Sequence, residues 1–363
     1  VTLRWLGATH CDEITPMLNA SRAHNADSFR AALHDWRSPT FSFVFADTDG
    51  AIGYQCVGRI PIRHNWDRGY RPGWDPAHQW QAVIPYAGMP ALANPPAGWI
   101  RTANNRTAPA DYPYPLSGTW SSGHRAERIR HMLEAQDRFD QADFVRMHYD
   151  VRSQRAAEAV PRLLTALANV TDSQIQIAAT VLHAWDYRME ANQIGAALFE
   201  VFFRQWCRTV AAARFAPETA ALMADVIGGL ALMLLAEDQV GWFSAGDREK
   251  QIVAAFRATL TELTSRLGAD LDGWTWGLLH TITLHHPLSS RGDLASLLNR
   301  GGYALGGNAF TVWNTGSDAH YAANLGASYR LIADLSSSPP VLWGMDTAGQ
   351  SGHPGSQHYC GQL

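Results

Sequence analysis

The stretch FSFVFADTDGAIGYQCVG, residues 41–58, contains two runs rich in apolar side chains that meet at Asp49-Gly50. Phe, Val, Ile and Tyr favour strands, and an Asp-Gly pair between two such runs is a strong hairpin signal. We therefore predict two antiparallel strands. The DTDG turn does not fit an EF-hand calcium loop, because position 12 counted from Asp47 is Gly58, where a Glu is needed.

The sequence on either side of this hairpin predicts more strands, so that residues 1–123 form a β-rich part with one helix at about 26–36. Four apolar side chains share one face of that helix: Phe29, Ala32, Leu33 and Trp36.

From 124 to 299 the pattern is helical, because apolar residues recur at intervals of three and four. Two stripes are predicted to be core: Ile194, Ala197, Leu198, Val201 and Phe202 in one, and Ile252, Ala255, Phe256, Leu260, Leu263 and Leu267 in the other. Strand patterns return in residues 300–363, as in NAFTVWN, ASYRLIADL and PVLWGM. The β–α–β order predicts an α+β fold, in which both ends share one sheet and the three parts form one interdependent domain.

Composition excludes several classes of partner. The chain has 363 residues and a net charge of −4, without a Lys/Arg cluster, so neither nucleic acid nor an anionic membrane is expected as a partner. The longest uncharged helical run, 226–236, is about half of the ~20 residues that span a bilayer. Charged residues make up only 17%, below the ~25% of typical soluble domains, which predicts that something else covers much of the surface.

The four cysteines, Cys11, Cys56, Cys207 and Cys360, lie far apart and have no CxxC spacing. This argues against a zinc ribbon or a redox pair and leaves free thiols or a single disulfide open.

Two groups of residues offer weak signals for chemistry. His280, His285 and His286 could bind a metal, but there is no HExxH motif, so polar packing near Pro287 is favoured. Ser351 lies in GQSGHPG, which does not match the GxSxG of a serine hydrolase, so it is disfavoured as a nucleophile.

The stretch IRTANNRTAP, residues 100–109, places Asn104 and Asn105 side by side. They could form a turn, because Asn tolerates left-handed backbone and bonds its own main chain. Alternatively, one amide could donate a hydrogen bond to an oxyanion during acyl transfer.

Arg125 opens a predicted helix, where a positive charge is disfavoured. It therefore needs a partner, either a nearby acid, Glu127 or Asp140, or another group.

Seven motifs, in one order over nearly all of the chain, resemble the penicillin acylase family of N-terminal-nucleophile (Ntn) amidohydrolases. They are SFRAALHDWRSPTFSFVFADTDGAIGYQCVGRIPIR, GWDPAHQWQAVIPYAGMP, NPPAGWIRTANNR, YPYPLSGTWSSGHRAERI, WTWGLLHTITLHHPLS, GASYRLIADL and GQSGHPGSQHY. The chain resembles the C-terminal two-thirds of the β-chain of that family.

This resemblance implies part of an αββα sandwich with a large helical insertion and without its N-terminal core strands. It implies that the intact enzyme cleaves itself and hydrolyses linear amides through an N-terminal Ser that is absent from this chain, with no cofactor. Asn104 falls on the oxyanion-hole amide of the family and Arg125 on a supporting arginine. Phe41 falls on a position that lines the acyl pocket.

The resemblance also implies partners: the rest of the β-chain and the α-chain of the same precursor, and a small amide substrate such as a β-lactam side chain or an N-acyl homoserine lactone. The start VTLRWLG is typical of the interior of a domain, and a periplasmic or secreted precursor is expected.

The sequence departs from the family pattern at two places. A calcium site is in doubt, because Leu116 stands where calcium-binding members carry Asp. At the end of the motifs, Cys360 and Gly361 replace the usual acidic residues. The alternative is a non-catalytic scaffold or partner subunit derived from the same fold.

Overall fold

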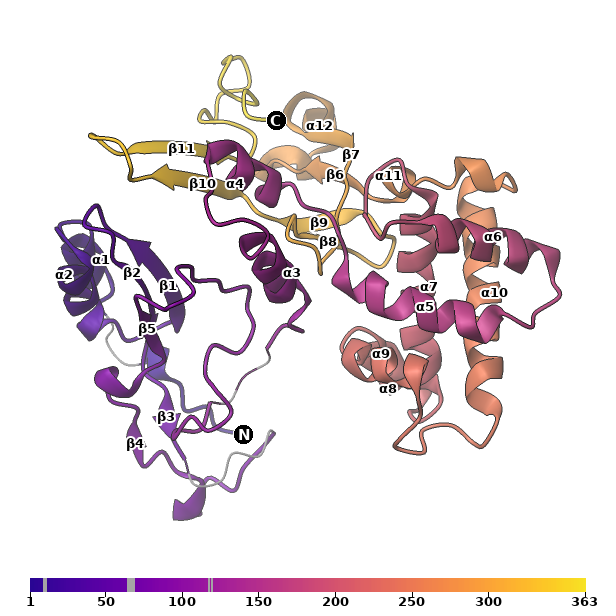
Figure 1. The fold of residues 1–363 in the computed structure, drawn as a ribbon, viewed down its shortest axis with the longest axis horizontal. Helices are drawn as coiled ribbons and strands as arrows, with labels where there is room; N and C mark the ends of the chain where they lie inside the picture. The colour runs from indigo at the N-terminus through magenta and orange to yellow at the C-terminus, as the bar shows by residue number, and fades with distance from the viewer. Residues whose placement is uncertain (9–11, 64–68, 117, 119) are drawn as a thin grey trace. The chain divides into compact units, whose positions relative to one another are not determined.

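The computed structural model describes residues 1–8, 12–63, 69–116, 118 and 120–363 (Figure 1). The chain divides into two compact units, which we describe one at a time. The first contains Val1–Ala126 and Ala333–Val341, and the second contains Glu127–Ile332 and Leu342–Leu363. The predicted division at 123 and 299, and the single interdependent domain, stay predictions.

The first unit combines short helices with short strands. Its helices are α1 (Ile14–Ala20) and α2 (Ala26–Ala32), with 3-10 turns at Leu6–Ala8, Leu33–Asp35, Pro76–His78 and Tyr86–Gly88. Its strands are β1 (Phe41–Ala46), β2 (Ile52–Val57), β3 (Pro61–Ile62), β4 (Ala82–Val83) and β5 (Ala91–Ala93). The predicted helix at 26–36 is therefore α2 followed by a 3-10 turn.

The predicted hairpin is confirmed. β1 and β2 pair antiparallel from Phe41↔Val57 to Ala46↔Ile52, and β5 adds to the other edge of β2. The Asp47 carboxylate accepts hydrogen bonds from the main-chain N–H groups of Asp49 and Ala51 at 3.1 and 2.9 Å. The Asp47 side chain therefore stabilises the turn by bonding the main chain of the turn itself.

The middle strand β2 separates two small cores, because successive side chains of a strand point to opposite faces. On one face, Val57 packs with Leu33 and Trp36 of the helical segment, and Phe43 packs against them. On the other face lies a second cluster of buried residues: Tyr54, Cys56, Ile84 and Met89.

The second unit is mostly helical. Its helices are α4 (Gln141–His148), α5 (Gln154–Leu167), α6 (Ser173–Ala184), α7 (Ile194–Ala212), α8 (Pro217–Ala224), α9 (Gly228–Ala236), α10 (Asp247–Leu267), α11 (Trp276–Leu279) and α12 (Gly292–Leu298). Helix α3 (His124–Leu133) begins in the residues of the first unit and ends in those of the second. The strands after the helices are β6 (Thr281–Leu284), β7 (Arg300–Ala304), β8 (Thr315–Ser317), β9 (Ala323–Gly326), β10 (Tyr329–Asp334) and β11 (Val341–Asp346).

Helix α7 is the centre of the helical core, and α10 packs along it (Figure 1). Both apolar stripes predicted from the sequence lie in this core, where Phe202 and Phe256 meet with ring centroids 5.8 Å apart. Strands β7, β6, β9 and β8 form one sheet in that order, with only the β6–β9 pair parallel. A separate two-stranded sheet consists of β10 and β11.

A charged pair lies inside this helical core. Arg155 of α5 is 5% exposed and Glu200 of α7 is 9% exposed. The Arg155 Nη2 lies 3.2 Å from the Glu200 Oε2, and the Asn308 Nδ2 donates to the same oxygen at 2.9 Å. The guanidinium also faces the Phe310 ring at 3.7 Å from its centroid. Buried charges of this kind are tolerated only when paired and hydrogen-bonded.

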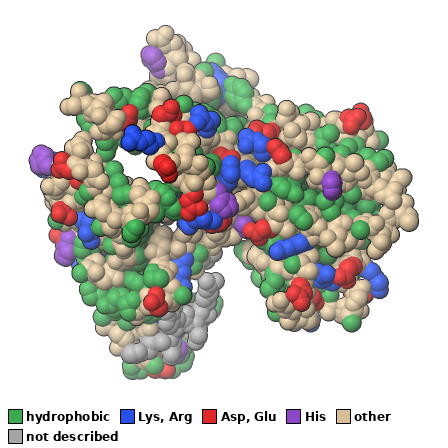
Figure 2. All heavy atoms as spheres, viewed as in Figure 1, with side chains coloured by type: hydrophobic (Ala, Val, Ile, Leu, Met, Phe, Trp, Pro, Cys, Tyr) green, Lys and Arg blue, Asp and Glu red, His purple; other side chains and the backbone are tan. Residues whose placement is uncertain are grey.

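Among the described residues, no single helix is apolar and long enough to cross a bilayer, and only the pair α8 and α9, bent by 89°, passes that test jointly. On the face drawn in Figure 2, Lys and Arg side chains of the described residues lie beside Asp and Glu side chains. Cys56, Cys207 and Cys360 are free thiols, and Cys11 lies outside the described residues.

Candidate functional site

The candidate site lies in the segment between β5 and α3, in which the described residues form neither helix nor strand. Apolar side chains hold this segment in place, since Ile100, Tyr114 and Leu116 pack against the Tyr54 face of the sheet. Leu116, at the position where an Asp would favour calcium, therefore contributes to packing.

Asn104 lies on the surface of this segment, with its backbone in the left-handed region at φ 59°. The Arg125 Nη2 donates to the Asn104 Oδ1 at 2.8 Å, and the Ser121 N–H donates to the Asn104 carbonyl at 2.9 Å. Two residues about 20 positions away therefore fix both the main chain and the side chain of Asn104.

The contact with Arg125 determines which way the amide points. A guanidinium can only donate hydrogen bonds, so the carbonyl oxygen of the amide must face it. The Asn104 NH₂ group then points away from Arg125, and none of the hydrogen bonds among the described residues uses it. The arrangement presents an oriented and unused neutral donor on the protein surface.

Arg125 lies at the start of α3, where the helix dipole does not favour a cation. Partial burial lowers the pKa of its guanidinium. Its second contact is the Ser121 Oγ at 3.4 Å. Of the two acids that the sequence offered as partners, Glu127 forms an ion pair with Arg130, and Asp140 caps the N-terminus of α4. The alternative reading of Arg125 as a surface ion pair is therefore not what the structure shows.

Asn105 has a different role from its neighbour. Its Oδ1 accepts from the Ala103 N–H at 3.1 Å, and its Nδ2 donates to the Arg106 carbonyl at 2.9 Å. Both ends of this amide bond the local main chain, as in a turn. The turn interpretation therefore fits Asn105, and the oxyanion role of Asn104 stays a prediction.

Phe41 begins β1 and is 50% exposed. Its ring lies edge-on to Trp36 and Phe43, with centroids 5.7 and 6.4 Å away. It therefore presents an aromatic surface supported from behind by other rings. Its role in an acyl pocket stays a prediction.

The histidines do not form a metal cluster. His280 is fully buried, where its Nδ1 bonds the Tyr321 carbonyl at 2.8 Å and its Nε2 bonds the Thr315 hydroxyl at 3.0 Å. Burial lowers the pKa of this imidazole. Among the described residues, no group of three or more His, Cys, Asp or Glu side chains could hold a metal ion.

The turn at His285 and His286 meets the C-terminal motif, because both line a cavity of about 200 Å³ with Ser351. The Ser351 hydroxyl accepts from the His353 N–H at 3.1 Å, and no hydrogen bond to either lining histidine occurs among the described residues. This geometry gives Ser351 no general base.

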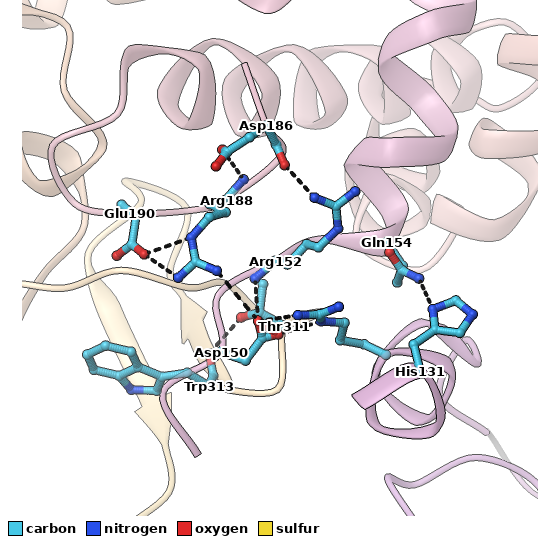
Figure 3. Close-up of polar contacts among 10 residues, drawn as sticks. His131, Asp150, Arg152, Gln154, Asp186, Arg188, Glu190, Thr311 and Trp313 are labelled. Atoms are coloured by element: carbon cyan, nitrogen blue, oxygen red, sulfur yellow. Dashed lines mark hydrogen bonds and ion pairs between the residues drawn. The ribbon is translucent and has the colours of Figure 1, made fainter. Parts of the chain in front are cut away.

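Sequence reasoning missed a second polar cluster, around Asp150 (Figure 3). Its buried carboxylate accepts from the Arg128 Nε and Nη2 at 2.6 and 3.0 Å, and the Arg188 Nη1 lies 3.9 Å away. Arg188 also pairs with Glu190 at 2.7 Å. Because each of these two guanidinium groups is paired with a carboxylate, we interpret the cluster as one that stabilises the local structure. No motif in the sequence signals it, because its members come from separate segments.

Comparison with known proteins gives consistent matches. The family model described as penicillin amidase matches residues 1–363. The acyl-homoserine lactone acylase QuiP of Pseudomonas syringae pv. tomato is 29% identical, over 94% of this chain and 45% of that protein. The penicillin acylase 2 proenzyme of Pseudomonas sp. strain SE83 is 31% identical, over 91% of this chain and 43% of that protein.

A solved structure of the thermostable penicillin G acylase from Alcaligenes faecalis covers 97% of this chain with a TM-score of 0.72. The match covers 67% of that structure, and at 18% identity it shows the fold alone. It confirms the predicted mixed α+β fold class. The chain spans about half the length of the curated relatives that it matches.

Proposed function

Because the chain belongs to the penicillin amidase family, we propose that it forms part of an amidohydrolase in which Asn104 stabilises the oxyanion of acyl transfer. The observation that carries this proposal is the unused amide NH₂ of Asn104, held in one orientation by Arg125. A fixed neutral donor lowers the barrier because it need not reorganise when charge develops on the carbonyl oxygen.

The proposed reaction begins with a serine at the N-terminus of the mature β-chain, supplied by the rest of the precursor. Its hydroxyl attacks the amide carbonyl, its own α-amino group accepts the proton, and the carbonyl oxygen becomes an oxyanion. Asn104 donates to that oxygen together with a backbone N–H. The C–N bond then breaks, the amine leaves with the proton, and water hydrolyses the acyl-enzyme to a carboxylic acid.

The proposed substrates are N-acylated amines, because the relatives are named for acyl-homoserine lactones and penicillins. The remainder of the precursor is the proposed partner, and export to the periplasm or the medium is proposed with it. The proposal is tested with the full-length precursor, after its cleavage has been confirmed from the new N-terminus. We expect release of a free amine from N-acyl homoserine lactones or from phenylacetyl amides. A cleaved and folded protein that releases no amine from either series would favour the non-catalytic scaffold.

Arg125→Ala is expected to lower kcat about tenfold and to leave KM nearly unchanged, because the Asn104 amide loses the group that fixes its orientation. Arg125→Lys keeps a charge but not the planar guanidinium, so it should recover only part of kcat. Steady-state kinetics of the cleaved enzyme provide the measurement. Arg106→Ala is the matched control, since the side chain of this exposed arginine bonds only the Pro109 carbonyl among the described residues. Equal kinetics for Arg125→Ala and Arg106→Ala would contradict the orienting role.

Phe41→Ala is expected to change acyl preference rather than the chemistry of the amide. Removal of a half-exposed ring enlarges the proposed acyl pocket and withdraws apolar contact from short acyl groups. We expect the ratio of kcat/KM for long over short acyl chains to rise by about tenfold, since one methylene in an apolar pocket is worth ~1–3 kcal/mol. A parallel loss for every acyl length would place Phe41 outside the pocket.

A further inference from the structure

Tyr54 occupies the middle of β2, the central strand of the first unit's three-stranded sheet, and is 5% exposed. Its hydroxyl lies between two others, at 2.9 Å from the Ser42 Oγ and 2.7 Å from the Thr107 Oγ1. A phenol donates one hydrogen bond and accepts others, so Tyr54 can satisfy both neighbours at once. These three hydroxyl groups form a continuous chain through the partly buried side of the sheet.

Thr107 lies three residues after Asn104, in the same irregular segment. The described residues of this segment form no strand or helix, although Asn94 at its start bonds Ile52 of β2 at 2.9 Å through both its main chain and its side chain. The bond from Tyr54 ties the segment to this strand a second time, close to Asn104, and β2 is paired on both edges. Arg125 fixes the rotation of the Asn104 amide, whereas Tyr54 acts on the placement of the segment that carries it.

We propose that Tyr54 is a positioning residue for the oxyanion amide, which it holds in place through the Thr107 hydroxyl. This inference rests on the proposed function of Asn104. The ring of Tyr54 contributes to the apolar cluster, and its hydroxyl contributes to the placement of the segment. Burial raises the pKa of this phenol above its ordinary value, so the hydroxyl is neutral at neutral pH.

The geometry makes the two contributions separable. Tyr54→Phe keeps the ring and removes only the hydroxyl, and Thr107→Val keeps the shape of the threonine and removes its hydroxyl. We expect either change to lower kcat about tenfold with KM within about twofold, because a small displacement of a donor weakens transition-state contacts more than substrate binding. Thr107→Ser restores a hydroxyl and should recover kcat. The double variant should lose no more than the larger of the two single changes, since both remove the same bond.

Two controls distinguish positioning from general loosening. Tyr112→Phe removes another phenol hydroxyl from the same irregular segment, one that bonds the Gly88 carbonyl. Ser42→Ala removes the other partner of Tyr54 and leaves the bond to Thr107. We expect both controls to keep kcat within about twofold of the parent enzyme, by the same reasoning.

The test uses the cleaved full-length enzyme, with kcat, KM and the melting temperature measured for each variant. If Asn104→Gly has no effect on kcat, the proposed function itself fails. If Asn104→Gly abolishes activity while Tyr54→Phe equals the parent enzyme, the function stands and the positioning role is wrong. Equal losses of kcat for Tyr54→Phe and Tyr112→Phe would also overturn it, because they would show that any weakening of the segment suffices.

Discussion

Replacement of Asn104 by alanine is expected to lower kcat of the cleaved enzyme by about 10²–10³-fold, or about 3–4 kcal/mol, while KM changes little. The amide donates only where negative charge develops, so its loss raises the barrier and leaves the bound substrate almost unaffected. What supports this role is the contact at 2.8 Å that turns the amide oxygen to Arg125, together with an NH₂ group that has no hydrogen-bond partner among the described residues.

The left-handed backbone of Asn104 requires a second variant. Alanine at φ 59° carries a backbone penalty of roughly 1–2 kcal/mol, and glycine carries none. Asn104→Gly therefore removes the donor without backbone strain, and we expect it to be as inactive as Asn104→Ala. Recovery of activity in the glycine variant alone would show that the backbone, rather than the amide, is what the site needs.

Asn105→Ala is the matched control for the loss of kcat in Asn104→Ala. Because both ends of its amide bond the local main chain, we expect a loss of stability of about 1 kcal/mol and nearly normal kcat. Cleavage of the precursor must be confirmed for each variant, since a maturation defect would resemble a catalytic one. If Asn105→Ala loses activity and Asn104→Ala keeps it, the donor is the neighbouring residue. If both variants stay active, this segment does not form the oxyanion hole.

Replacement of Glu200 by alanine is expected to lower the free energy of unfolding by about 3–5 kcal/mol, because it leaves the Arg155 guanidinium buried without a carboxylate. The Asn308 amide loses its acceptor at the same time. Urea denaturation of the full-length protein, followed by tryptophan fluorescence and far-UV circular dichroism, provides the measurement.

The double variant Arg155→Met, Glu200→Leu separates the cost of an unpaired charge from the value of the pair. It removes both charges together, so we expect it to be far more stable than Glu200→Ala. Arg291→Ala provides a surface control: it breaks an exposed ion pair with Asp293, and its effect should stay below about 1 kcal/mol. A Glu200→Ala protein as stable as Arg291→Ala would mean that water reaches the guanidinium and that this core is not closed.

Local patterns in the sequence predicted several regular elements of this protein, but not all of them. NAFTVWN, predicted as a strand, is a loop with a single bridge between Asn308 and Asn314, and among the described residues no sheet contains strands from both ends. The β1–β2 hairpin follows from strand-forming residues around Asp49-Gly50, and the stripes on α7 and α10 follow from apolar residues spaced three and four apart. The family resemblance pointed to Asn104, Arg125 and Phe41. The local sequence alone could not separate the roles of Asn104 and Asn105, because both amides share one local context.

The sequence by itself determined the β1–β2 hairpin and the buried faces of α7 and α10, since periodicity records whether a side chain avoids water. Only the tertiary structure decided which side chains meet. Arg125 and Asn104 are 21 positions apart, Thr107 and Tyr54 are 53 apart, and Asn308 and Glu200 are 108 apart. A hydrogen bond depends on the positions of two groups, and over such separations those positions are set by the path of the whole chain, which no local pattern of residue types records.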